Sequence, residues 1–213
     1  MERFDILVSW ASRPKFLARP ICFILMVLLL VGCASSPPSK PGNICSIFQE
    51  KEDWYASAKA SAERWNAPIA VQMAIINHES AFVEDARPPR IRFLGIPLWR
   101  PTSAYGYSQA TDSTWERYLK KTGNSGADRD DFGDAIDFVG WYMQQSQLEL
   151  GLSKNDAYNQ YLAYHEGQGG YQRGTWRGKT ALLTVARKVA ATASRYQQQL
   201  SSCQADLESS MAD

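Results

Sequence analysis

Histidine and cysteine are scarce in this sequence of 213 residues, with two and four copies. His78 and His165 stand far apart, and the two cysteines beyond residue 33, Cys45 and Cys203, lie near opposite ends of the remaining chain. Zinc and related metals need three or four such side chains grouped at one site. A glycine-rich phosphate-binding loop is missing as well. We therefore expect no metal site and no cofactor.

A surplus of charge of one sign is also lacking. The chain has 23 Lys and Arg residues and 22 Asp and Glu residues, for a formal net charge of +1. Residues 1–32 contain four of the basic and two of the acidic side chains, so the rest of the chain carries about −1. Nucleic-acid binding depends on a basic surface, and we expect no nucleic-acid partner.

An apolar run of membrane-spanning length, about 20 residues, is not found. Residues 21–31 form an apolar run of eleven residues that follows Arg13, Lys15 and Arg19, which fits a secretion signal. The run ends in Leu30-Val31-Gly32-Cys33, which resembles the end of a bacterial lipoprotein signal. That resemblance implies a signal peptide over residues 1–32 and a lipid on Cys33. An uncleaved anchor helix is the alternative.

Residue 34 is Ala rather than Asp, and in enterobacterial-type lipoproteins this implies sorting to the outer membrane. The protein would then be lipid-anchored there and face the periplasm. Residues 33–46 contain three prolines and are predicted to form the lipidated N-terminus and a flexible tether.

Two cysteines are left once Cys33 carries lipid and Cys22 leaves with the signal. In an oxidising compartment, this even remainder favours a disulfide between Cys45 and Cys203. In the chain-entropy model, closing so long a loop contributes on the order of 4–5 kcal/mol. Two unpaired thiols are the alternative.

The remaining chain shows helical patterns and turn signals but no convincing strand pattern. We predict a single all-α domain of about six helices over residues 47–203, followed by a C-terminal tail over 204–213. The expected helices cover residues 47–65, 67–80, 112–121, 131–150, 153–164 and 180–200. Glycines between 167 and 178 predict a long turn region. A Pro-rich loop over 84–102 contains Phe93, Leu94, Ile96 and Trp99, which predicts that the loop is packed.

Residues 72–82 contain the first candidate for chemistry. Apolar residues at helical spacing predict a buried helix that ends near Glu79. Burial raises the pKa of a carboxyl group and favours the protonated form, which suits a general acid. The alternative is that Glu79 is a solvated residue in the last helical turn.

Three motifs follow one another along the chain. Asn77-His78-Glu79-Ser80 places Glu-Ser at a predicted helix end. Gly106-Tyr107-Ser108-Gln109, with Thr114-Trp115 after it, forms a Gly-x-x-Gln pattern. Ala163-Tyr164-His165-Glu166-Gly167 is similar to Ala-Tyr-Asn-x-Gly. In this order the three resemble the motifs of the soluble lytic transglycosylase (SLT-type) family within the lysozyme-like superfamily. The resemblance covers roughly residues 54–200.

The resemblance implies a lysozyme-like fold and cleavage of peptidoglycan glycan strands during cell-wall remodelling. Glu79 would protonate the oxygen between N-acetylmuramic acid and N-acetylglucosamine. It would then act as base on the muramic C6 hydroxyl, which attacks C1 and leaves a 1,6-anhydro end. Conventional glycosidases need two carboxylates, whereas an intramolecular nucleophile removes the need for the second.

The resemblance also assigns roles to other residues. Tyr164 would be catalytic, close to Glu79, where it orients the substrate or the carboxyl group. Gly106 has no Cβ and would let a sugar approach the backbone. The substrate-binding candidates are Ser80, Ser103, Tyr105, Gly106, Tyr107, Gln109 and Glu166.

The chain departs from the family at His165, where Asn is usual, and at Tyr107-Ser108, where Leu-Met is usual. Glu166 is the candidate for a second carboxylate if the enzyme is a hydrolytic muramidase. An inactive peptidoglycan-binding lipoprotein is a further alternative. Arg90 and Arg92 either contact the carboxylates of the peptide stem or are exposed to solvent. Cell-envelope machinery, such as a secretion or division complex, is an unspecified partner.

Overall fold

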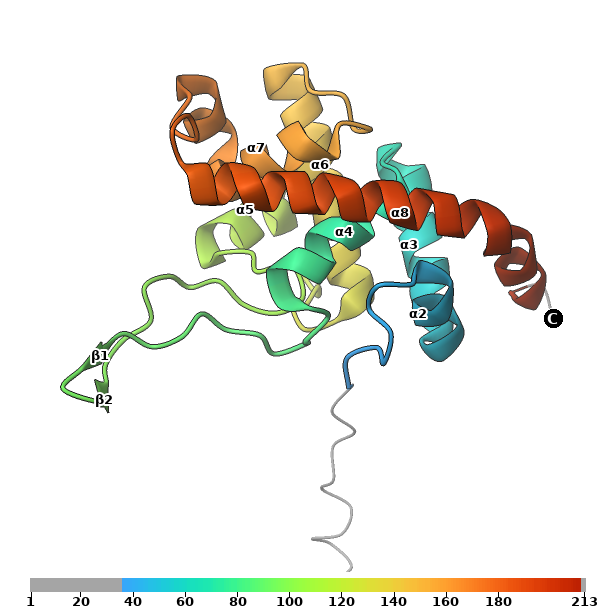
Figure 1. The fold of residues 1–213 in the computed structure, drawn as a ribbon, viewed down its shortest axis with the longest axis horizontal. Helices are drawn as coiled ribbons and strands as arrows, with labels where there is room; N and C mark the ends of the chain where they lie inside the picture. The colour runs from blue at the N-terminus through green and yellow to red at the C-terminus, as the bar shows by residue number, and fades with distance from the viewer. Residues whose placement is uncertain (1–35, 212–213) are drawn as a thin grey trace, which may run out of the picture. The chain divides into compact units, whose positions relative to one another are not determined.

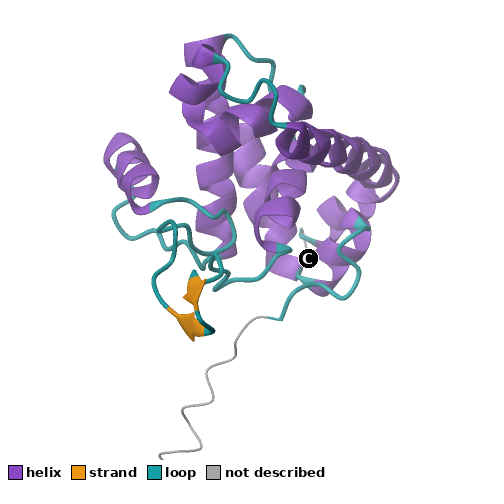
Figure 2. Ribbon diagram, turned by 60° about the vertical axis from the view of Figure 1, so that its left-hand side comes forward, coloured by secondary structure: helices purple, strands orange, loops and turns teal. Residues whose placement is uncertain are grey.

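A computed structural model describes residues 36–211, and the predictions for the signal peptide and for Cys33 lie outside this range. The described residues form seven helices and one short antiparallel hairpin (Figures 1 and 2). The helices are α2 (Ile44–Glu50), α3 (Glu52–Trp65), α4 (Ile69–Ser80), α5 (Asp112–Thr122), α6 (Phe132–Leu150), α7 (Ala157–Arg173) and α8 (Thr180–Ser210), and the strands are β1 (Arg92–Phe93) and β2 (Ile96–Pro97). The prediction of an all-α domain is confirmed.

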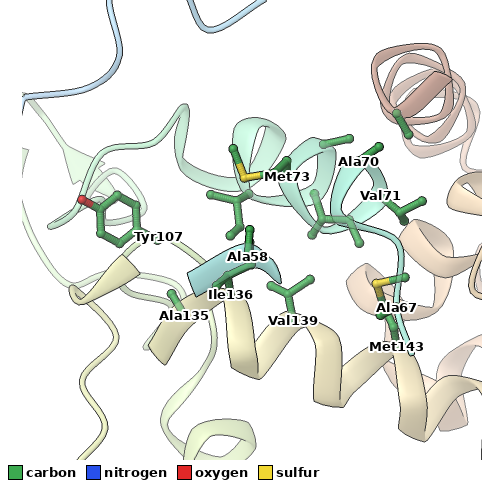
Figure 3. Close-up of a cluster of buried hydrophobic side chains, with 14 of the residues drawn as sticks. Ala58, Ala67, Ala70, Val71, Met73, Tyr107, Ala135, Ile136, Val139 and Met143 are labelled. Atoms are coloured by element: carbon green, nitrogen blue, oxygen red, sulfur yellow. The ribbon is translucent and has the colours of Figure 1, made fainter. Parts of the chain in front are cut away.

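Helix α4 lies at the centre of this domain. Residues 70–76 of this helix are all buried, and it packs against α3, α6 and α8, as expected for a mostly apolar helix in a core. Figure 3 shows Met73 of α4 among Ala58 of α3 and Ile136 and Val139 of α6. Burying one such large apolar side chain contributes about 1.5–3 kcal/mol. This packing fixes the end of α4, where Glu79 lies.

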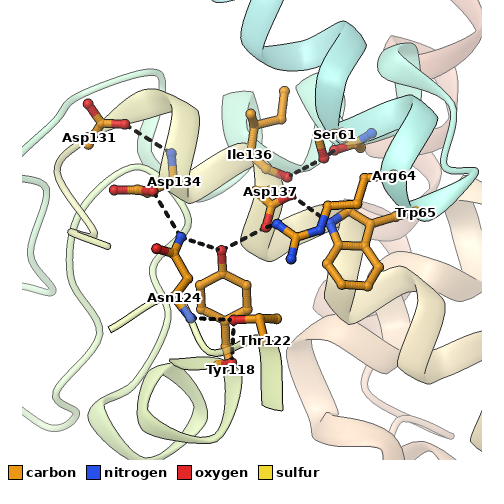
Figure 4. A network of polar contacts seen from close by, with 11 residues as sticks. Ser61, Arg64, Trp65, Tyr118, Thr122, Asn124, Asp131, Asp134, Ile136 and Asp137 are labelled. Atoms are coloured by element: carbon orange, nitrogen blue, oxygen red, sulfur yellow. Dashed lines mark hydrogen bonds and ion pairs between the residues drawn. The ribbon is translucent and has the colours of Figure 1, made fainter. Parts of the chain in front are cut away.

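A polar network around Asp137 holds α5 against the core. The Asp137 carboxylate accepts hydrogen bonds from the Tyr118 hydroxyl of α5 (2.7 Å) and from the Trp65 indole of α3 (2.7 Å) (Figure 4). Arg64 adds an ion pair at 3.2 Å. Three helices thereby meet at one carboxylate, which fixes the second half of α5 against the core.

The N-terminal part of the domain is more ordered than predicted. Ile44 begins α2 and is fully buried, while the Asn43 side chain caps this helix. The Ser39 hydroxyl donates to Glu50 at 2.6 Å, and the Tyr196 hydroxyl donates to the Pro41 carbonyl. The prediction of a flexible tether up to residue 46 is therefore wrong for its described part. The predicted first helix is also divided in two, at Lys51.

The C-terminal tail predicted for residues 204–213 is instead helical through Ser210. Helix α8 continues past Cys203, and Leu207 is buried. Cys45 and Cys203, the pair expected from the sequence, form a disulfide that joins α2 to α8. None of the helices in residues 36–211 is long and apolar enough to cross a membrane.

Helix α7 is longer than predicted and enters the glycine-rich stretch. Asp156 rather than Ser153 caps it, by accepting a hydrogen bond from the Asn159 amide at 3.0 Å. The backbone leaves helical geometry at Gly167 (φ +74°) and then continues to Arg173. The kink turns the residues just before Gly167 toward the pocket described below.

The Pro-rich loop is not packed as predicted. Its apolar residues lie on the β1–β2 hairpin, which reaches out beyond the helices (Figure 1), and they are exposed to solvent. The prediction failed because apolar composition was taken as a sign of burial, although about half of a folded protein's surface is apolar.

Candidate active site

A pocket of about 410 Å³ opens where the end of α4 meets α5, α6 and α7. Three of the residues predicted for the site reach it from three segments: Glu79 from α4, Gln109 from the loop before α5, and Tyr164 from α7. The lining residues are Glu79, Pro88, Thr102, Ala104, Gln109, Ala110, Thr111, Thr114, Phe138, Tyr142, Tyr164, His165, Glu166 and Gly167. A larger hollow of about 750 Å³ lies beside the end of α8 and contains none of the predicted catalytic or substrate-binding residues.

Glu79 has the titration behaviour of a general acid that can also act as a base. Burial raises the pKa of its carboxyl group to about 7, and a hydrogen bond from Tyr161 opposes this rise. At neutral pH the carboxyl is therefore close to half protonated. A group with its pKa near the working pH can donate a proton in one step and accept one in the next.

Tyr161 is the residue that the sequence analysis missed. Its hydroxyl is hydrogen-bonded to Glu79, and its ring lies edge-on to His78 at 5.2 Å. Tyr161 stands three residues before Tyr164 on α7, so both side chains project from the same side of the helix. The spacing of Tyr161 from Tyr164 of the third motif is the signal that could have identified it.

Tyr164 lies near Glu79, as predicted, but its hydroxyl bonds elsewhere. It donates to the Ser108 carbonyl at 2.6 Å, and the ring packs against Tyr142 with centroids 4.9 Å apart. Burial, together with the nearby Glu79 charge, raises the pKa of Tyr164 well above its usual value. Tyr164 therefore stays neutral and holds the loop that carries Gln109.

Gln109 organises the loop that forms one wall of the pocket. Its side-chain amide donates to the carbonyls of Ala86 (2.9 Å) and Gly106 (2.8 Å). These two bonds join the segment after α4 to the segment before α5. The amide nitrogen is therefore engaged in holding the wall, and Gln109 lines the pocket from there.

Gly106 serves a different purpose from the predicted one. Its φ is +74°, and a Cβ at this position would lie 2.0 Å from the Arg129 carbonyl oxygen. The glycine therefore permits close packing of two backbone segments, and the prediction that it makes room for a sugar is wrong.

Four other predicted substrate-binding residues lie outside the pocket. Tyr107 is 2% exposed and packs edge-on against Trp54. The Ser80 hydroxyl donates to the Ile76 carbonyl, and the Ser103 hydroxyl accepts a hydrogen bond from the first amide of α5. Tyr105 donates to Asp130 at 2.7 Å. These contacts account for all four residues as parts of the scaffold.

Glu166 lines the pocket, but its negative charge is balanced by the positive charge of Lys179. Lys179 contacts both of its carboxylate oxygens at 2.8 Å, and Thr175 and His165 also bond to it. Burial by itself would raise the pKa of Glu166. These hydrogen bonds, led by the one from Lys179, outweigh burial and lower the pKa to about 2. Glu166 is therefore ionised at neutral pH and has no proton to donate.

Residues at the N-terminal end of α5 and on α6 also line the pocket, although none of them was predicted as a site residue. Thr111 and Thr114 offer hydroxyl groups, and Phe138 and Tyr142 form an aromatic floor. Sugars present both hydroxyl groups and apolar C–H faces, so this lining suits a glycan. Within residues 36–211, no group of three or more His, Cys, Asp and Glu side chains is arranged to hold a metal ion.

A test of Tyr161 uses the pH dependence of activity. The hydrogen bond from Tyr161 lowers the pKa of Glu79, so in the Tyr161→Phe variant that pKa rises. The alkaline limb of kcat/KM, where the acid form of Glu79 is lost, should move upward by about one pH unit. The measurement is the rate of peptidoglycan solubilisation between pH 5 and 9.

Tyr171→Phe is the matched control, because Tyr171 lies on the same helix and its hydroxyl also donates to a side chain, that of Asn159 at 2.8 Å. Its profile should stay where the wild-type profile lies. A Tyr161→Phe profile that only drops in height, without moving, would show that Tyr161 does not control Glu79.

A family model described as "Transglycosylase SLT domain" matches residues 21–203. The chain belongs to the SLT-type lytic transglycosylase family. Searches of curated proteins and of solved structures returned no match. The seven helices of the described region are those of an all-α, lysozyme-like SLT domain, as predicted. Membership of the SLT family carries its general function, which is binding peptidoglycan and cleaving it by a transglycosylase-type reaction.

Proposed function

We propose that this SLT protein cleaves the β-1,4 bond between N-acetylmuramic acid and N-acetylglucosamine without water and leaves a 1,6-anhydro end. The observation that carries the proposal is the unequal state of the two carboxyl groups in the pocket. Glu79 has a pKa of about 7, whereas Glu166 is held ionised by Lys179. Glu79 can therefore donate a proton, whereas both oxygens of Glu166 already bond to Lys179, Thr175 or His165, which opposes a role for Glu166 as base or nucleophile.

In the first step, protonated Glu79 gives its proton to the glycosidic oxygen. The bond between this oxygen and C1 of the muramic acid breaks, and positive charge develops on the sugar ring. Ionised Glu79 is then the nearest base. In the second step it takes the proton of the C6 hydroxyl, whose oxygen forms a new bond to C1. Glu79 ends as it began, and no atom of water is used.

Tyr161 and Tyr164, which both lie on α7, support this two-step reaction. Tyr161 stabilises the ionised form of Glu79 between the two steps through its hydrogen bond. Tyr164 fixes the loop wall through the Ser108 carbonyl. Because nucleophile and electrophile belong to one sugar, the second step gains from proximity, which is worth several kcal/mol in well-oriented systems.

The cellular setting is part of the proposal. The signal-like residues 21–31, Cys33 and Ala34 support a lipid-anchored protein at the outer membrane, facing the periplasm. There it would act on the wall during remodelling.

The test is digestion of purified sacculi in water enriched in ¹⁸O, with products read by mass spectrometry. A transglycosylase releases muropeptides that are lighter by one water than hydrolysis products and that contain no ¹⁸O from the solvent. Products with the mass of a reducing end and with one ¹⁸O would show a muramidase instead. Binding to sacculi without release of any product would show an inactive peptidoglycan-binding protein.

A further inference from the structure

The β1–β2 hairpin exposes large apolar side chains that the domain does not use. The side chains of Phe93, Leu94, Ile96 and Trp99 are 64%, 86%, 62% and 64% exposed. They lie close together on a projection that reaches away from the helices (Figure 1). Single apolar side chains on a surface are ordinary, but a cluster of this kind marks an interaction site.

The turn at the tip of the hairpin has an unfavourable residue for its conformation. Leu94 and Gly95 both have positive φ, +49° and +83°. Asn-Gly or a similar pair is preferred in such two-residue turns, and a residue with a Cβ is strained there by about 1–2 kcal/mol. Leu94 is also the most exposed large apolar residue of the described chain. Stability of the domain therefore does not explain a leucine at this position.

The hairpin separates apolar and basic side chains. Phe93 pairs with Ile96, so these two lie on one face, and Ile91, two residues before Phe93, shares that face. Arg92 pairs with Pro97 on the opposite face. Backbone bonds between Ile91 and the pair Leu98 and Trp99, at 2.8 and 2.9 Å, keep this arrangement without help from the core.

Beyond Glu84 and Asp85 at its start, the loop carries only positive charge. Residues 86–111 contain Arg87, Arg90, Arg92 and Arg100 but no Asp or Glu. The ion pairs of residues 36–211 include none of the four, although Arg87 stacks on Tyr105 and Arg90 and Arg100 donate to the Leu98 and Pro88 carbonyls, so their positive charges are not balanced by a carboxylate there. A surface of this composition is complementary to anionic phosphate groups that border an apolar layer.

We propose that the hairpin, residues 91–99, inserts its tip into the interfacial layer of an anionic phospholipid membrane. Phe93, Leu94 and Ile96 enter the boundary between headgroups and acyl chains, and Trp99 lies at headgroup level, where tryptophan is enriched. Arg92 meets the lipid phosphates from the other face. A membrane contacts an inserted tip on every side, whereas a protein partner contacts it on one face. This favours lipid over protein as the binding partner.

Insertion also sets the position of the active site. Pro88 and Thr102, which flank the hairpin, line the catalytic pocket. A hairpin held in the membrane surface therefore places the pocket at a fixed distance from that surface. The contact is weak by itself and reversible, because one small apolar wedge with a few cationic side chains is a marginal anchor.

The experiment places an environment-sensitive nitrobenzoxadiazole dye on Leu94→Cys in the full chain and adds vesicles. Leu148→Cys is the matched control, since Leu148 is 68% exposed but lies on α6 away from the hairpin. The unsubstituted chain, treated with the same dye, is the blank for Cys22 and Cys33. With vesicles of phosphatidylcholine and 30% phosphatidylglycerol, the dye at 94 should shift to the blue and be quenched by brominated lipid. The dye at 148 should not change.

The lipid charge and the arginine supply two further readouts. The shift at 94 should weaken at least threefold with pure phosphatidylcholine, and also with the added substitution Arg92→Glu. No shift at 94, or an equal shift at 148, would overturn the proposal. A shift at 94 with sacculi but not with vesicles would also overturn the proposal, because the hairpin would then bind the peptidoglycan substrate. Cleavage activity does not enter these readouts, so this test and that of the proposed function can fail separately.

Discussion

The Glu79→Gln variant should solubilise purified peptidoglycan about 1,000-fold more slowly than the wild-type protein, or not at all. Acid and base catalysis by a placed group contributes about 100- to 10,000-fold per step, and Glu79 serves both proton transfers in the proposed reaction. Gln has the same shape but can neither donate an acidic proton nor accept one. The measurement is release of muropeptides from sacculi over time.

Folding of this variant can be checked through the same carboxyl group, because its raised pKa makes stability depend on pH. Below about pH 4.5 Glu79 is protonated in both the folded and the unfolded chain, so it has no effect on the free energy of unfolding. Between pH 4.5 and 7 the folded state binds more protons, so rising pH destabilises it. The shift of the pKa from 4.5 to about 7 lowers the free energy of unfolding by roughly 2–3 kcal/mol in total, after a reduction because the carboxyl borders an open pocket.

Glu79→Gln removes this pH dependence. Its melting temperature at pH 8 should be equal to or higher than that of the wild-type protein, while activity is lost. A variant that keeps more than a tenth of wild-type activity would contradict the role of Glu79. A variant that melts earlier at pH 8 would contradict the burial of an uncompensated carboxyl group.

A large loss of stability is expected for Gly106→Ala. The new methyl group would lie 2.0 Å from the Arg129 carbonyl oxygen and 2.5 Å from its carbon, so the backbone must shift. Overpacking of this kind costs about 1–3 kcal/mol, and the positive φ adds about 1–2 kcal/mol. We expect a loss of about 3–4 kcal/mol in the free energy of unfolding, measured by urea denaturation.

Gly123→Ala separates the two causes. Gly123 has the same φ, +74°, but nothing lies within 4 Å of its added Cβ. Its loss should therefore be about 1–2 kcal/mol. Gly106→Ala should also reduce cleavage, because Gln109 bonds to the Gly106 carbonyl and this wall of the pocket moves with it. Equal losses for the two variants would show that the close approach of Gly106 and Arg129 has no energetic role.

The sequence predicted the fold well where periodicity and caps agree. Gly123 and Gly151 end α5 and α6 as expected, and Asp131 caps α6. The prediction failed at residues 36–46 and 204–210, which are ordered by contacts between chain ends far apart in sequence. Helix α2 is held by Gln199 and by the disulfide from α8, and no local pattern contains that information.

The site was predicted in its principal residue but not in its supports. Glu79 could be predicted as the catalytic acid because it is the one carboxyl group at the end of an apolar helix. Tyr161, by contrast, looks like an ordinary core aromatic, and only the tertiary fold, in which α7 packs against α6 and α8, brings its hydroxyl to Glu79. Gly106 and Tyr107 lie inside a recognised motif, yet both serve packing. A motif marks a local conformation, and it does not say which side chain faces the substrate.

The disulfide has a mechanical consequence. Tension applied to the chain ahead of Cys45 enters α2, and Cys45 passes it directly to Cys203 on α8. Helix α2 therefore cannot separate from the domain by itself. The force is distributed along α8, a helix of 31 residues that packs against α2, α4 and α7. With the proposed lipid anchor at Cys33, a pull between the membrane and a bound glycan strand would enter the domain here, and this one bond would resist it.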